Sequence, residues 1–256
     1  MKKTRKSVLI ILLLLFVFIL SGCELSIQDV KKQYDVSKEI EGTELTKEEI
    51  LEKFDNILKD FENVNYAEMV MEGIYGEEEA NAKLQFDFSS NNIKKYKFYF
   101  SITAPEEQMT VFLDKEILYV ESIYQEEVVK EKGTITEILG DISNEEVKEE
   151  LLDEVMSYIG MDLLFSKESY EELINTFKGE LEKNQDFMTV KIDSDGSLII
   201  DYSQDSGQGR VVFNKDNKLI YIGLGGSNIN MSVTINYNKP NIKLPSKDGY
   251  QDAEVE

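Results

Sequence analysis

The sequence predicts an α+β fold in which one strongly curved antiparallel sheet, a half-barrel of about ten strands, carries helices packed on one face. Two observations lead to this expectation. Segments that alternate apolar and polar residues occur in two runs, and short polar turns join the segments within each run. Segments with apolar residues at helical spacing precede the first run and separate the two. Because short connections join antiparallel neighbours, each run is expected to form a meander.

The first helix is expected to begin after Thr46. Thr46 and Glu49 have the spacing of a capping box, in which each side chain accepts a hydrogen bond from the other residue's backbone. The apolar residues that follow recur every three or four positions and would form one buried helical face. They are Ile50, Phe54, Ile57, Leu58, Phe61 and Val64.

Two groups of strands and a helical middle follow. Alternation predicts strands near 68–75, 83–88, 95–103, 109–113 and 117–121, and again near 187–192, 198–202, 210–213, 219–224 and 229–237. Helical spacing between the groups predicts helices over about 143–159 and 166–181, joined by a short apolar stretch at 161–165. The turn Asp193-Ser194-Asp195-Gly196 begins like a calcium loop, but it lacks the later ligands and is interpreted as a hairpin turn.

Composition excludes several classes of function. The chain has 50 acidic and 28 basic residues, so phosphate backbones would repel it and nucleic acid is not an expected partner. It contains no His, no Trp and one Cys, which excludes His-based catalysis, Cys-rich zinc sites and internal disulfides. No pair of catalytic carboxylates stands out among the acidic residues. We therefore expect a non-enzyme with no catalytic residues, no metal and no cofactor.

The N-terminus has the pattern of a secretory signal. Lys2, Lys3, Arg5 and Lys6 form a basic region, and Val8 to Leu20 are uninterrupted apolar residues, a run too short for a typical membrane span. Leu20-Ser21-Gly22-Cys23 follows. This segment resembles the lipobox signal peptide of bacterial lipoproteins. The alternative is an uncleaved N-terminal anchor with an incidental Cys, yet the only Cys of the chain occupies the lipobox position.

The lipoprotein resemblance implies a covalent anchor. It implies cleavage between Gly22 and Cys23, a diacylglyceryl group on the Cys23 sulfur, and a location on the outer face of the bacterial cytoplasmic membrane, as in Gram-positive bacteria. Residues 1–22 hold four of the 28 basic residues and no acidic ones, so the mature chain would carry a net charge of −26. Bacterial membranes are also anionic, so the two acyl chains of the anchor would have to hold the protein there.

The expected domain organisation follows from these patterns. Residues 1–22 are the signal peptide, 23–45 a lipidated flexible tether, 46–245 the folded domain, and 246–256 an acidic tail. At 22 residues, a tether over 24–45 would have a root-mean-square span of about 26 Å.

The order of elements resembles the lipoprotein-localisation carriers of the LolA and LolB type and the mycobacterial lipoproteins of the LppX and LprG type. The ending Ile242-Lys243-Leu244-Pro245 looks like that of many Gram-positive lipoproteins with this order. The resemblance implies a half-barrel whose concave face holds acyl chains, so a lipid is the candidate ligand. The alternative is an interaction module with a filled core. The candidate cavity residues, each of which could instead be plain core, are Met69, Met71, Phe98, Phe100, Met156 and Phe165.

Overall fold

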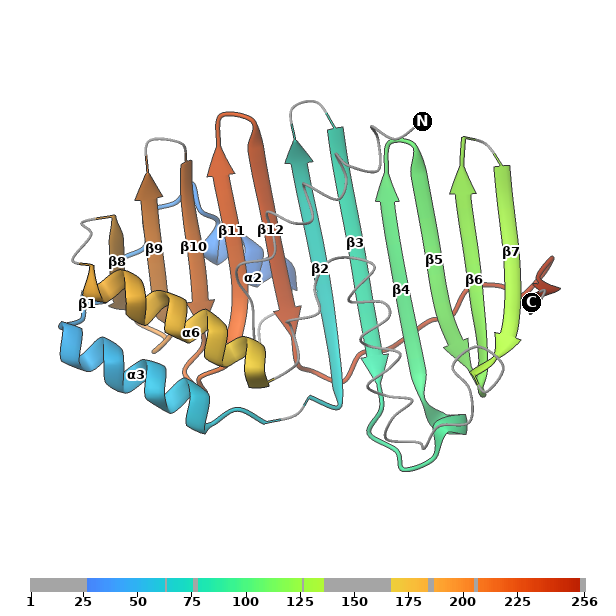
Figure 1. Ribbon diagram of the computed structural model, residues 1–256, viewed down its shortest axis with the longest axis horizontal. Helices are drawn as coiled ribbons and strands as arrows, with labels where there is room; N and C mark the ends of the chain where they lie inside the picture. The colour runs from blue at the N-terminus through green and yellow to red at the C-terminus, as the bar shows by residue number, and fades with distance from the viewer. Residues whose placement is uncertain are drawn as a thin grey trace.

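One large, open antiparallel sheet dominates the structure (Figure 1). The computed structural model describes residues 27–62, 64–75, 78–125, 127–135, 167–183, 187–204 and 207–253. Within these ranges, thirteen strands lie in the order β1-β8-β9-β10-β11-β12-β2-β3-β4-β5-β6-β7-β13. The signal segment, Cys23 and the helix expected at 143–159, with Met156 and Phe165 among the candidate cavity residues, lie outside the described residues.

The described elements follow the predicted order and add three strands and one helix, α2. The helices are α2 (Ile27–Tyr34), α3 (Lys47–Lys59) and α6 (Lys167–Glu182), and a 3₁₀ turn spans Ile93–Lys95. The strands, in two meanders with short additions at each edge, are β1 (Thr43–Glu44), β2 (Tyr66–Tyr75), β3 (Glu78–Asp87), β4 (Lys97–Ala104), β5 (Glu107–Asp114), β6 (Ile117–Tyr124), β7 (Glu127–Thr134), β8 (Met188–Ile192), β9 (Leu198–Gln204), β10 (Gly207–Phe213), β11 (Leu219–Gly226), β12 (Ile229–Asn236) and β13 (Gln251–Asp252).

The two meanders join at the centre of the sheet. Strand β12 pairs antiparallel with β2, with Val233 opposite Met71 and Ile235 opposite Met69. The predicted single sheet is thereby confirmed, although the expected number of about ten strands was too low. Strand β7 was missed because its sequence, with Glu127, Lys130 and Lys132 among few apolar residues, lacks a clear apolar alternation.

Helices α3 and α6 cover the face of the sheet that we call the core face. The Thr46–Glu49 capping box is present as predicted, and Ile50, Phe54 and Ile57 of α3 are buried. Phe54 stacks on Phe177 of α6 with ring centroids 5.8 Å apart. These helical residues join the inward side chains of the strands in one hydrophobic cluster, so α3, α6 and both meanders share a core.

The opposite face, the outer face, is also covered. Helix α2 lies across β11 and β12 on this side, and residues 238–250 cross it toward β7 (Figure 1). The expectation of helices on one face was therefore wrong. The outer clusters form because β9, β10 and β11 carry apolar residues on both faces, and the outward ones need cover of their own.

The described parts of both predicted flexible ends, residues 27–45 and 246–253, belong to the fold, so the expected tether over 23–45 and tail over 246–256 need correction there. Val30 and Tyr34 of α2 are each 1% exposed, and β1 pairs with β8. At the other end, Tyr250 packs edge-on against Phe112 and Tyr119, and β13 pairs parallel with β7. Sparse but large apolar side chains dock both segments, although each segment is mostly polar.

The packing of β4 gives a stability test. Phe98 is fully buried, whereas its neighbour Lys97 is exposed on the other face. Truncation of a buried Phe in a filled core removes contacts and leaves a cavity, so Phe98→Ala should lower the free energy of unfolding by about 3–5 kcal/mol. Lys97→Ala should change it by no more than about 0.5 kcal/mol. Urea denaturation measures both values, and a loss for Phe98→Ala as small as that for Lys97→Ala would contradict a filled core.

Candidate functional site

The candidate cavity residues that the structure describes belong to the filled core. Met69, Met71, Phe98 and Phe100 are at most 4% exposed, and all lie in the cluster shared with α3 and α6. They project from the core face of β2 and β4. The structure brings these four residues together as predicted, but it places them among packed neighbours, and neither cleft described below contains any of them.

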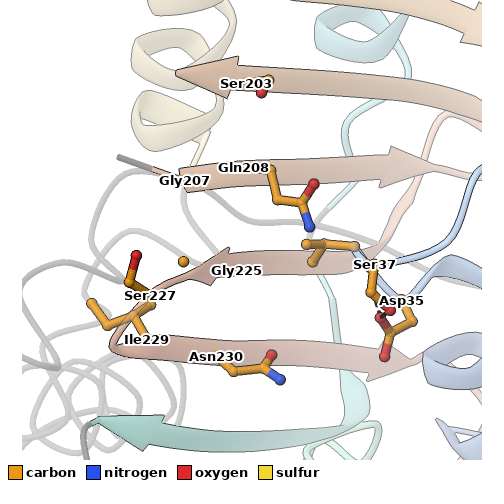
Figure 2. A pocket seen from close by; sticks show the side chains of 11 residues that line it. Asp35, Ser37, Ser203, Gly207, Gln208, Gly225, Ser227, Ile229 and Asn230 are labelled. Atoms are coloured by element: carbon orange, nitrogen blue, oxygen red, sulfur yellow. Dashed lines mark hydrogen bonds between the residues drawn. The ribbon is translucent and has the colours of Figure 1, made fainter. Parts of the chain in front are cut away.

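Two adjoining clefts lie on the outer face, where the chain leaves α2. One, of about 490 Å³, is bounded by residues 35–37 and by the ends of β10, β11 and β12, as Figure 2 shows. The other, of about 570 Å³, extends over β8, β9 and β10. Val36, Ser37, Ser203 and Gln208 line both. Because they share these residues, the two clefts form a single polar depression, which extends to both sides of the segment after α2.

Glycines in β11 let this segment approach the sheet closely. A Cβ atom at Gly223 would lie 2.1 Å from Cγ1 of Val36 and 2.5 Å from the hydroxyl oxygen of Tyr221. A Cβ atom at Gly225 would lie 2.9 Å from Cγ2 of Val36. Val36 therefore occupies the space that side chains at these two positions would fill, and both positions require glycine for this packing.

A β-bulge completes the surface under α2. Val212 pairs with Tyr221 and Phe213 with Leu219, so Ile220 is an extra residue in β11. Ile220 and Tyr221 both pack in the outer cluster with Val30 and Tyr34 of α2. The bulge thus places two consecutive large side chains on one face, where a regular strand would place only one.

Arg210 fixes the backbone that follows α2. Its side chain is nearly fully buried, and its Nε donates to Oδ1 of Asp201 at 2.5 Å. Its Nη1 donates to the carbonyl oxygen of Asp35 at 2.8 Å, and its Nη2 to that of Lys38 at 3.0 Å. Lys191 also pairs with Asp201, at 3.1 Å. The guanidinium therefore ties two carbonyls of residues 35–38 to a carboxylate of β9.

Tyr34 makes a second polar attachment. Its hydroxyl donates to Oδ2 of Asp193 at 2.9 Å and lies 3.0 Å from Oγ of Ser197. Oδ1 of Asp193 accepts from the backbone N–H groups of Asp195 and Ser197, each at 2.9 Å. The Asp193–Gly196 segment is thus the hairpin turn that the sequence predicted, and the side chain of Asp193 organises it.

The electrostatics of the depression follow from these contacts. Hydrogen bonds from Ser37, the hydroxyl first and then the backbone N–H, hold the pKa of Asp35 below its usual range. Burial raises the pKa of Tyr34. Burial also raises the pKa of Tyr221, and the carboxylate of Asp35 adds to the effect. At neutral pH Asp35 is therefore ionised, whereas Tyr34 and Tyr221, which pack beneath the segment after α2, are neutral.

This arrangement offers hydrogen bonds to a ligand. The lining presents the hydroxyls of Ser37 and Ser203 and the amides of Gln208 and Asn230, while the carboxylate of Asp35 already accepts from Ser37. In the part of the chain that the structure describes, no three His, Cys, Asp or Glu residues are grouped to hold a metal ion. None of the helices described has the length and apolar character of a membrane span.

The sequence contained signals for the residues that its analysis missed. Val30 and Tyr34 have the i, i+4 spacing of a buried helical stripe, but two residues are too few to stand out. Arg210 is the only arginine after Arg5, and it directly precedes the apolar run Val211-Val212-Phe213. An isolated arginine beside such a run is typical of a buried, paired charge.

Comparisons with known proteins give no family. No protein-family model matches the chain, and no curated protein matches it either. Among solved structures, a DUF1329 family protein from Desulfovibrio piger shows 9% sequence identity and a TM-score of 0.20, covering 73% of this chain and 90% of that one. A β-barrel-like DUF1849 protein from Brucella abortus shows 9% identity and a TM-score of 0.19, covering 68% and 96%. At these TM-scores neither likeness supports a conclusion about function.

Removal of the Arg210 charge should release the segment after α2. Arg210→Met leaves the partly buried Asp201 carboxylate with Lys191 as its remaining partner and takes charged donors from the carbonyls of Asp35 and Lys38, so we expect a loss of about 1.5–3 kcal/mol in the free energy of unfolding. Lys215→Met, at an exposed position, is the control and should be close to neutral. Urea denaturation gives the loss, and amide hydrogen exchange should show faster exchange at residues 30–38 than in β2. Unchanged exchange there would contradict the anchoring role.

The buried tyrosines predict a loss of stability at alkaline pH. Below pH 10 both the folded and the unfolded chain keep these phenols protonated, so their contribution to stability is fully present. Above the unfolded value of about 10 the unfolded chain ionises first, and stability falls by up to about 1.4 kcal/mol per pH unit for each tyrosine. Tyr221→Phe should make this decline shallower in urea titrations between pH 10 and 11. An equal slope in wild type and variant would show that Tyr221 ionises in the folded state as in the unfolded one.

Proposed function

We propose that the protein is a lipoprotein anchored through Cys23 on the outer face of the bacterial cytoplasmic membrane, and that its sheet domain is a non-catalytic interaction module with a filled core. The basic n-region, the apolar stretch and the lipobox Cys support the anchor. The covalent diacylglyceryl group is then the link to the bilayer that the sequence indicates for this protein. The described domain is the part that binds a partner.

The burial of the candidate cavity residues is the observation that carries the choice of an interaction module. A cavity for acyl chains needs apolar side chains that face open space, as ligand pockets do. Met69, Met71, Phe98 and Phe100 instead have their surfaces covered, with Phe88 and Phe98 stacked at 6.4 Å between ring centroids. The carrier hypothesis suggested by the lipoprotein-localisation resemblance therefore has less support than the filled module.

The exposed side of the helix layer suggests the chemistry of the partner. Exposed carboxylates on α3 and α6 outnumber the lysines beside them, and a surface of one sign attracts ligands of the other. We propose that this side binds a basic protein surface or a cationic group of a cell-wall polymer. The exposed carboxylates, which lie on the two neighbouring helices, include Glu48, Glu52, Asp55, Glu171 and Glu172.

Native mass spectrometry of the chain from residue 24, which includes every described element, tests the filled module against the carrier. The module predicts the bare mass of the polypeptide, because the described candidate cavity residues are covered by packed neighbours and face no open space. A denaturing spectrum of the same sample is the control that separates bound from covalent additions. Phospholipid or fatty acid that survives purification, in a ratio near one per chain, would overturn the filled module and restore the carrier.

Substitution of the anchor tests the lipoprotein assignment. Cys23→Ala leaves the basic region and the apolar stretch intact, so export should begin, but no sulfur remains to be lipidated. We expect the variant either to keep its signal segment or to be shed from the membrane. Ser21→Thr, a small change beside the Cys, is the matched control and should stay anchored. Detergent-phase partition and intact mass report the outcome, and a variant that partitions at the wild-type mature mass would show that Cys23 carries no anchor.

A further inference from the structure

We infer that the outer face of the sheet lies against the bilayer, so that α3 and α6 point away from the membrane. This orientation rests on the proposed lipid anchor at Cys23. It follows from two independent features of the chain: how closely the anchor is attached to the outer face, and how the charges on that face are paired.

The attachment is short and begins at the middle of the outer face. Three residues separate Cys23 from Ile27, the first residue of α2, and the four Cα–Cα steps between these two residues can span at most about 14 Å. Helix α2 contacts β11 and β12, and its Lys31 pairs with Glu72 of β2. Strands β12 and β2 are the sixth and seventh of the thirteen described strands. The anchor therefore holds the sheet near its centre.

Because the sheet is wide, this short attachment determines which face of the sheet meets the bilayer. Thirteen strands at about 4.8 Å spacing extend about 60 Å, far beyond the reach of the attachment. If the core face lay on the bilayer, this attachment of three residues would have to pass the sheet and the helix layer, each about 10 Å thick. With the outer face on the bilayer, the lipid on Cys23 reaches the membrane directly.

Six outward carboxylates of the sheet are neutralised by basic partners. They lie on β2, β3, β5, β6 and β9, and each has a Lys or Arg partner on a neighbouring strand, on α2 or on residues 238–250. The protein thus removes negative charge from this face, although the chain as a whole is strongly acidic. The pairs are Glu68–Lys83, Glu72–Lys31, Asp87–Lys239, Asp114–Lys247, Glu121–Lys130, Asp201–Lys191 and Asp201–Arg210.

This pairing suits contact with anionic headgroups. Surface ion pairs add little to folding stability, but they cancel a field that would otherwise repel an anionic membrane within a Debye length of about 8 Å. Lys243 adds an exposed positive charge on the segment that crosses the outer face, and a lysine near an anionic bilayer is attracted to it. The acidic helices α3 and α6 lie on the other side, where the same membrane would repel them.

Site-directed labelling of the lipidated full chain in vesicles of phosphatidylglycerol and phosphatidylethanolamine tests the orientation. Cys23 is the only native cysteine, and lipid occupies its sulfur, so one introduced cysteine gives one label. Lys243→Cys reports the outer face, Asn175→Cys the exposed side of α6, and Glu106→Cys the β4–β5 hairpin at one end of the strands; all three positions are exposed. Each carries a fluorophore, and a lipid with a nitroxide on its headgroup quenches it.

The expected order of quenching is Lys243→Cys above Glu106→Cys above Asn175→Cys. Because about 20 Å of sheet and helix separate the two faces, the first should exceed the last at least about threefold. Equal quenching at Lys243→Cys and Asn175→Cys, or strongest quenching at Glu106→Cys, would overturn the orientation while leaving the anchor in place. Protein that does not partition with vesicles would instead overturn the lipoprotein assignment, and the orientation with it.

A longer attachment separates the two causes. Insertion of 20 Gly and Ser residues after Leu25 gives a flexible span of about 25 Å and removes the constraint of reach. If reach sets the orientation, quenching at Lys243→Cys should fall toward that at Asn175→Cys. If the difference persists, the difference in charge between the outer face and the acidic helix layer sets the orientation, and raising the salt concentration should then reduce it.

Discussion

The docking of residues 27–40 onto the outer face of β9, β10 and β11 is the interaction on which the rest of the structure depends. These strands carry apolar side chains on both faces, and α3 and α6 can cover only one of them. Ile199, Val212, Ile220 and Tyr221 would meet water without α2. The guanidinium of Arg210 makes the docking specific, because the carbonyls it binds come from only one segment.

This two-sided burial explains the shape of the molecule. A sheet with one solvent-exposed face needs packing partners on its apolar face only. A sheet with apolar residues on both faces needs packing partners on both. Here α2 covers one half of the outer face and residues 238–250 cover the other, around Phe112 and Tyr119. Between them the outward residues of β2 and β3 include Glu68, Glu72 and Lys83, and their ion pairs take the place of apolar cover.

Most of the sheet could be predicted from sequence, and the outer face could not. Alternation located the strands that carry Met69 and Phe98, and the Thr46 capping box located α3, because these are local patterns with a fixed period. The docking of Val30, Tyr34 and Tyr250 depends on partners more than 80 residues away, and each docked segment has too few apolar residues to show a period. The unbroken run Leu219 to Ile222 was the clearest sign of burial on both faces.

The candidate site, like the sheet, could be predicted from the sequence only in part. The sequence grouped Met69, Met71, Phe98 and Phe100 correctly, yet it could not distinguish a packed face from a hollow one, because the same side chains serve both.

The two-residue strands at the edges of the sheet have a consequence of a different kind. A wide sheet with open borders recruits further strands from other molecules. β1 and β13, built from opposite ends of the chain, occupy those borders. Edge strands of only two residues offer little backbone for a further strand to pair with, so they oppose edge-to-edge association of the sheet.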